Sequence, residues 1–169
     1  MPAAREPRVH YQSGPQPRPA SLAAQPRRAL LDVNVLIALL DAAHVHHAPA
    51  MRWLQREISA GWASCPLTQA GCIRVMSQPA YPGALPAAQV AARLAEAAAG
   101  PDHMFWPDDL DLLAPGALDW SFVLGHRQVT DSHLLALAVR HGGRLVSFDR
   151  RIVPAAVPDA SAEHLVLID

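Results

Sequence analysis

The residues VTDSHLLALAVRHGGRLVSFDR (129–150) decide the fold of this chain. The first half predicts a buried helix, with Thr130 as its expected N-cap and the glycine pair at 142–143 as its end. The apolar run RLVSFD (144–149) that follows predicts a buried strand closed by an aspartate. A helix that leads directly into a buried strand is the repeating unit of parallel α/β sheets.

The rest of the chain repeats this alternation of short apolar strands and helices. A helix between Pro86 and Gly100 shows the usual preference for proline at the start of a helix and glycine at its end. The pattern predicts strands at 29–32, 62–65, 103–106 and 164–168, and further helices at 35–42, 48–60 and 67–77. The sequence therefore predicts an α/β protein whose parallel sheet is covered on both faces.

Composition separates the chain into two segments. Residues 1–27 are expected to be a flexible Pro/Arg-rich arm, either an inert tail or a nucleic-acid contact, because residues 1–26 hold six of the 16 prolines and no apolar period. Residues 28–169 are expected to form one domain. After residue 28, nine arginines face 14 acids, so this part carries a net charge of −5. An acidic body that acts on RNA needs metal ions or a local basic patch.

Two other features bear on the compartment. No apolar run approaches the roughly 20 residues of a membrane span, and the first residues lack the apolar region of a secretory signal. Cys65 and Cys72 are too few for a disulfide framework and are expected to be reduced core thiols. We therefore expect a soluble cytoplasmic protein with no membrane partner.

Three aspartates are expected to meet at one edge of the sheet. Asp32 closes the first strand, Asp149 closes the 144–149 strand, and Asp131 is placed in the first turn of the helix before it. Sites in open parallel sheets form at the carboxyl ends of strands. Each aspartate could instead be only a helix cap. Clustered carboxylates repel one another, and a divalent cation relieves that repulsion, activates water and stabilises charge on a phosphate.

Several stretches resemble the PIN-domain family, specifically the VapC-type toxins of bacterial toxin–antitoxin pairs. They follow the family's order from residue 28 to residue 169 and comprise LLDVNVLIALLD (30–41), HVHHAPAMRWL (44–54), CPLTQAGCIRVMSQP (65–79), FWPDDL (105–110), GHRQVTDSHLLALAVRHGGRLVSFDR (125–150) and the closing HLVLID. The resemblance implies a three-layer α/β/α sandwich with a central parallel sheet. It also implies a metal-dependent endoribonuclease that acts on tRNA, rRNA or mRNA, a small cognate antitoxin and a homodimer.

The resemblance also assigns roles to individual residues. Asp32, Asp131 and Asp149 match the first, third and fourth family acids, so they are the expected catalytic residues and ligands of Mg²⁺ or Mn²⁺. Gln69 stands where related toxins carry a Glu; its amide oxygen can accept hydrogen bonds but brings no charge, so weaker metal binding is expected. Asn34 is expected to support the first acid or to belong to a helix cap.

Arginines near the acids are candidate contacts to RNA phosphate. Arg74, Arg127 and Arg150 are selected because a guanidinium binds phosphate in a bidentate manner, although each could equally be a solvated or ion-paired surface residue. Thr130 could orient Asp131 through its hydroxyl as well as cap the helix. These residues complete the expected site.

Further polar residues receive simpler interpretations. The cluster of His44, His46 and His47 lacks a nearby cysteine motif and is not expected to bind zinc. Asp108 and Asp109 are expected to form a turn or a helix cap. These residues are not expected to take part in catalysis.

Two other function classes compete with the nuclease. Gln69 favours a catalytically weakened PIN-like protein that binds RNA or antitoxin, and the substitution Gln69→Glu distinguishes the two. A generic nucleotide-binding or phosphoryl-transfer enzyme is disfavoured, because the chain has neither a GxGxxG motif nor a P-loop.

Overall fold

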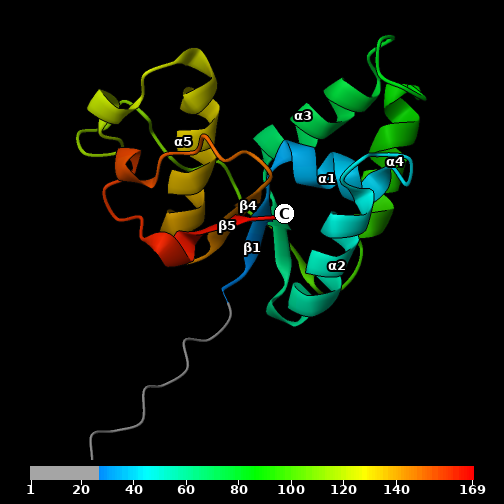
Figure 1. Cartoon of the computed structure of the whole chain (residues 1–169), viewed down its shortest axis with the longest axis horizontal. Coiled ribbons are helices and arrows are strands. Elements are labelled where there is room, and N and C mark those ends of the chain that lie inside the picture. The colour runs from blue at the N-terminus through cyan, green and yellow to red at the C-terminus, as the bar shows by residue number, and fades with distance from the viewer. Residues whose placement is uncertain (1–26) are drawn as a thin grey trace, which may run out of the picture.

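Five parallel strands form the centre of the molecule, seen in a computed structural model that describes residues 27–169 (Figure 1). The strands lie in the order β3-β2-β1-β4-β5. Their bounds are β1 Ala29–Leu31, β2 Trp62–Ser64, β3 His103–Phe105, β4 Arg144–Ser147 and β5 Leu165–Leu167. The arm expected over residues 1–27 lies outside the described residues, except for Arg27.

The strand order creates a crevice beside β1. From β1 the chain builds outward to β2 and β3, and it then returns to the other side of β1 to build β4 and β5. Leu30 pairs with Ala63 of β2 on one side and with Leu145 of β4 on the other. In such sheets, ligands bind where the winding reverses, at the carboxyl ends of the two strands involved. Here these are the ends of β1 and β4.

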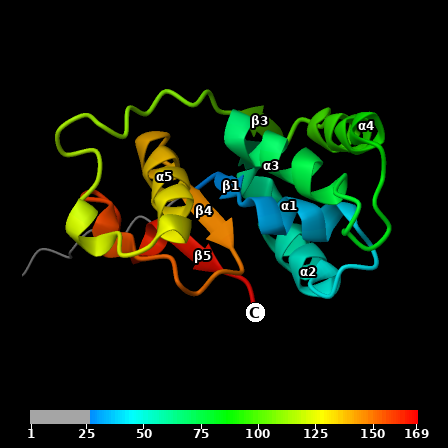
Figure 2. The same ribbon diagram turned by 90° about the horizontal axis from the view of Figure 1, so that it is seen from above.

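Helices cover both faces of the sheet, which confirms the predicted three-layer α/β/α sandwich (Figures 1 and 2). Alternate strand residues face opposite cores: Ala29 and Leu31 pack in the core under α1–α4, whereas Leu30 packs in the core with α5. The helices are α1 Val33–Leu40, α2 His47–Glu57, α3 Pro66–Met76, α4 Ala87–Ala98 and α5 His126–Arg140, with short 3₁₀ turns at Ile58–Ala60, Trp120–Phe122, Pro154–Ala156 and Ala162–His164.

Helix α5 begins earlier than the sequence analysis predicts. Gln128 Oε1 accepts hydrogen bonds from the backbone N–H groups of Leu124 (2.7 Å) and Gly125 (3.1 Å), which caps the helix before His126. Thr130 is therefore an exposed residue inside the helix, and its expected capping role is wrong. Asp131 correspondingly lies in the second turn of α5 rather than in the first.

The expected turn or cap at residues 108–109 is also wrong. Asp108 and Asp109 lie in an irregular segment that polar contacts connect to α5 and to His141, the residue after it. Asp108 contacts His133 Nε2 at 2.9 Å, and Asp109 contacts Arg140 Nε at 3.1 Å and His141 Nε2 at 3.3 Å. These pairs fasten the long connection after β3 to the helix that carries Asp131.

The cysteines and the lengths of the helices bear on the compartment of the protein. Cys65 and Cys72 are both buried free thiols, as predicted. Among residues 27–169, no helix is long and apolar enough to cross a membrane.

Candidate functional site

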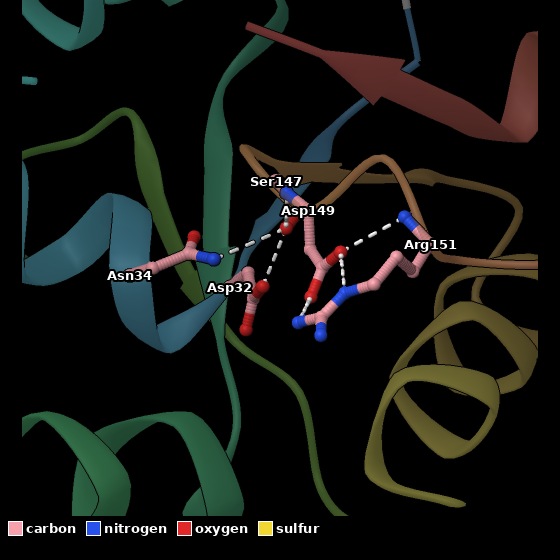
Figure 3. A network of polar contacts seen from close by, with 5 residues as sticks. All are labelled: Asp32, Asn34, Ser147, Asp149 and Arg151. Carbon is pink, nitrogen blue, oxygen red and sulfur yellow. Dashed lines mark hydrogen bonds and ion pairs between the residues drawn. The ribbon is translucent and has the colours of Figure 1, made fainter. Parts of the chain in front are cut away.

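A serine hydroxyl connects the carboxyl ends of β1 and β4 (Figure 3). Ser147 Oγ donates a hydrogen bond to Asp32 Oδ2 at 2.6 Å. The same oxygen accepts hydrogen bonds from the backbone N–H of Asp149 at 3.0 Å and from Asn34 Nδ2 at 3.3 Å. One buried hydroxyl therefore fixes the positions of the residues that follow β1 and β4 and of one residue of α1.

Asp32 combines the structural role and the site role that the sequence left as alternatives. Its Oδ1 accepts a hydrogen bond from the Val33 N–H at 2.6 Å and caps α1, while its Oδ2 accepts from Ser147. Only 8% of the residue is exposed. Burial raises the pKa of this carboxyl; the hydrogen bonds from Ser147 and Val33 oppose that effect, and the charge of Asp149 adds to it.

Asp131 reaches the same region from α5, on the opposite layer. Burial raises its pKa to about 6, and the negative charges of Asp32 and Asp149 contribute to the shift. Arg151 lowers it in part. Asp131 therefore lies within electrostatic reach of both other acids, although the three residues are distant in sequence.

Asp149 has a resident positive partner. Arg151 donates from Nε to Oδ1 at 2.9 Å and from its terminal Nη2 to Oδ2 at 2.6 Å, a bidentate pair visible in Figure 3. The Arg151 backbone N–H also donates to Oδ1 at 2.8 Å. These bonds hold the pKa of Asp149 below its usual value, and the charge of Arg127 acts in the same direction.

Comparison with known proteins places this geometry in a family. The PIN domain matches residues 29–157. This chain belongs to the PIN-domain family. Among its relatives, Ribonuclease VapC44 of Mycobacterium tuberculosis is 48% identical over 141 residues, which cover 83% of this chain and 99% of the relative. Ribonuclease VapC39 of the same organism is 48% identical over 143 residues, which cover 82% and 96%. The chain is thus a VapC-type PIN protein.

A solved structure supports the fold of the PIN domain. The crystal structure of Mycobacterium tuberculosis VapC20, described as a sarcin-ricin loop cleaving toxin, matches with a TM-score of 0.52. The match covers 72% of this chain and 89% of that one at 15% sequence identity. At that identity the likeness concerns the fold alone.

The donor atoms of this PIN site suit a hard divalent cation. Asp32 and Asp131 supply carboxylate oxygens, whereas Asn34 turns its Nδ2 toward Ser147 and its Oδ1 away from the Asp32 carboxylate (Figure 3). Mg²⁺ and Mn²⁺ prefer such oxygen ligands. Within residues 27–169, no three His, Cys, Asp or Glu side chains stand close enough together to hold a metal ion. The ion pair to Arg151 engages the third carboxylate, Asp149.

The remaining predicted site residues lie around this centre. Gln69 Nε2 donates to Ser64 Oγ at 2.9 Å, and that oxygen also contacts His103 Nε2 at 2.8 Å, so the amide is engaged at the end of β2. Arg74 is exposed on α3, and Arg127 is exposed at the start of α5. The structure does not bring Arg74 into contact with the acids, whereas Arg127 is near enough to act on Asp149.

The site differs from the expected one at an arginine and at a serine. Arg150 pairs with Asp169 instead of facing the aspartates, and the neighbouring Arg151 takes the position beside Asp149. Ser147 was not singled out by the sequence analysis. Its only local signal is its place two residues before the aspartate that closes a buried strand.

Proposed function

We propose that this VapC-type PIN protein is a metal-dependent endoribonuclease toxin that cleaves phosphodiester bonds in tRNA, rRNA or mRNA. The observation that carries the proposal is the raised pKa of Asp131, about 6, which burial and the negative charges of Asp32 and Asp149 produce in a PIN fold. Relatives that share 48% identity are named ribonucleases. A site with this excess of negative charge is stabilised by a cation.

The acidic side chains of the site are suited to hold a cation. Asp32 and Asp131 would bind Mg²⁺ or Mn²⁺, together with Asp149 once its pairing to Arg151 is released. When bound, the cation supplies an activated water and stabilises charge on the scissile phosphate. Ser147 fixes the orientation of the Asp32 carboxylate.

Two arginines are suited to phosphate. Arg127 is exposed beside the acids, and Arg151 presents a guanidinium that already binds one planar oxyanion, the carboxylate of Asp149. A phosphate oxygen pair makes the same bidentate contact. Both arginines would therefore orient the RNA backbone at the acidic cluster.

The family also supports proposals about partners. The chain would pair with a cognate small antitoxin, form a homodimer and act in the cytoplasm, as expected of a VapC-type toxin. Its RNA substrate would be a cellular RNA. These proposals rest on the membership of the chain in the VapC branch.

Gln69 supports a second candidate, a PIN protein that binds RNA or antitoxin with weakened cleavage. Its neutral amide donates to Ser64 and adds no charge to the site. The substitution Gln69→Glu tests this candidate. A large gain in Mn²⁺ affinity and cleavage supports the weakened site, whereas unchanged values for an active enzyme reject it.

Incubation of antitoxin-free protein with total tRNA and ribosomal RNA, in Mg²⁺ or Mn²⁺, tests the nuclease. The controls are EDTA, Asp32→Ala, and Asp159→Ala as the same change at an exposed acid. The proposal predicts discrete fragments from the wild type and from Asp159→Ala only. Absence of fragments in both metals would contradict it and favour the binding protein.

A further inference from the structure

The N-terminal end of α2 brings an exposed ring next to the acidic site. His46 stacks on Phe148 with a centroid separation of 4.6 Å and an interplanar angle of 23°. Phe148 lies between Ser147 and Asp149 in the chain, so the stack is anchored on the segment that carries these two site residues. The His44 ring follows at 5.7 Å from the His46 ring. The three rings form an aromatic surface at the edge of the site.

The same helix lines a groove that extends away from this surface. The groove has a volume of about 370 Å³ and lies between α2 and the C-terminal segment, lined among others by Pro49, Arg52, Trp53, Arg56 and Val166. From His46 to Arg56 the helix rises about 15 Å, at roughly 1.5 Å per residue. One helix therefore connects the aromatic surface with the groove.

Uncompensated positive charge distinguishes this groove. Arg52 and Arg56 lie one helical turn apart and exposed, and neither has an acidic partner in residues 27–169. Arg144 pairs with Glu57 at 2.6 Å, but its buried Nε has no acceptor within the described part of the chain.

The groove also contains two acids, Glu57 and Asp169, and each of them is paired with an arginine. Asp169 pairs with Arg150. After residue 28 the chain has a net charge of −5, so the two unpaired arginines of α2 are opposite in sign to the net charge of this part of the chain. Their charge is complementary to a polyanion and not to the rest of this surface.

We propose that α2 binds the RNA substrate outside the cleavage site, along a surface that we call the track. A base of single-stranded RNA stacks on the His46–Phe148 pair, and phosphates of the same strand bind Arg52 and Arg56. The inference rests on the proposed ribonuclease function and adds the path of the strand. Aromatic rings followed by a positive groove are the two elements with which proteins bind single strands without base-specific hydrogen bonds. An acidic protein segment is the competing occupant.

Fluorescence anisotropy with a labelled single-stranded RNA of about 12 nucleotides, within the usual range of single-strand sites, tests the track. All variants carry Asp131→Asn, so that the RNA stays intact. Arg52→Gln/Arg56→Gln should weaken binding about fivefold or more and should reduce the slope of log K against log salt by about 1.4, which is about 0.7 for each phosphate contact. Arg93→Gln, the same change at an exposed arginine of α4, should leave both values unchanged.

A substitution of His46 tests the stacking element separately. His46→Ala should weaken binding about fivefold with an unchanged salt slope, since a stacking contact releases no counterions, and His46→Phe should restore it. RNA affinity and salt slope equal to those of Arg93→Gln would overturn the track. Loss of binding to a labelled acidic peptide by the same variants would then identify an acidic protein segment as the occupant. Circular dichroism verifies that each variant is folded.

The outcome is separable from that of the nuclease. Wild-type protein that cleaves RNA, together with α2 variants that bind like the parent, refutes the track alone. Wild-type protein that cleaves no RNA, together with α2 variants that lose RNA binding, refutes the nuclease and retains the track.

Discussion

The Ser147 hydroxyl donates a 2.6 Å hydrogen bond to Asp32, across 115 residues of sequence. This bond joins the carboxyl ends of β1 and β4, the two strands between which the sheet reverses its winding. Because Ser147 also accepts hydrogen bonds from Asn34 and from the Asp149 backbone, one hydroxyl orders the floor of the acidic site.

Removal of this hydroxyl should affect both stability and catalysis. Ser147→Ala leaves the buried Asp32 carboxylate without one of its donors, which should lower the free energy of unfolding by about 1–3 kcal/mol. The pKa of Asp32 should rise further, so cleavage should require a higher pH. Urea unfolding and a pH–rate profile measure the two effects. Ser59→Ala, at an exposed serine, should change stability by less than about 0.5 kcal/mol.

The elevated pKa of Asp131 predicts a pH-dependent stability. A carboxyl whose pKa is raised from 3.8 to about 6 on folding destabilises the protein as pH rises through that interval. In EDTA, Asp131→Asn should therefore be more stable than the wild type at pH 7.5, by an amount of the order of 1 kcal/mol because solvent screens this half-buried group. The difference should vanish near pH 4. Urea unfolding across this pH range measures it, and a difference independent of pH would contradict the assignment.

Arg151 should compete with a cation for Asp149. Arg151→Gln frees the carboxylate from its bidentate partner, so Mn²⁺ affinity without RNA should rise about two- to fivefold, the range of a partly exposed ion pair. Isothermal titration calorimetry measures this affinity. Arg150→Gln is the matched control, because Arg150 pairs with Asp169 instead. Equal Mn²⁺ affinities for the two variants would show that Arg151 does not compete with the cation for Asp149.

The observed cap of α5 predicts a contrast between two nearby residues. Gln128→Ala removes the acceptor for the N–H groups of Leu124 and Gly125 and should cost about 1 kcal/mol of stability. Thr130→Ala, inside the helix, should change stability by less than about 0.5 kcal/mol. Chemical denaturation compares them. A larger loss for Thr130→Ala would restore the helix start that the sequence suggested.

The sequence predicted the layers of the fold because their signals are local. Apolar runs mark the strands, and Gly61 and Gly100 follow the helices before β2 and β3. The aspartates at the ends of β1 and β4 could be located because strand order places those ends together. Helix α5 was misplaced because a glutamine side chain caps it at a glycine, a weaker sequence signal than a threonine beside an aspartate.

Contacts between distant segments account for the remaining differences. Ser147 gives no pattern of its own, since its partner Asp32 is set by the register of β1 and β4. Arg150 and Arg151 are adjacent residues of the same type, and the sequence does not distinguish them. In the structure Arg150 pairs with Asp169, whereas Arg151 pairs with Asp149. Asp108 and His133 similarly meet only because the long connection after β3 packs on α5.

The proposed nuclease requires a divalent cation that is held by Asp32, Asp131 and Asp149. The most direct test is to titrate Mn²⁺ into wild type and Asp131→Asn, measuring binding by electron paramagnetic resonance and cleavage of one labelled RNA in the same samples. Binding and cleavage by the wild type should rise together with the Mn²⁺ concentration, and Asp131→Asn should lose both. Full Mn²⁺-dependent cleavage by Asp131→Asn would contradict this requirement.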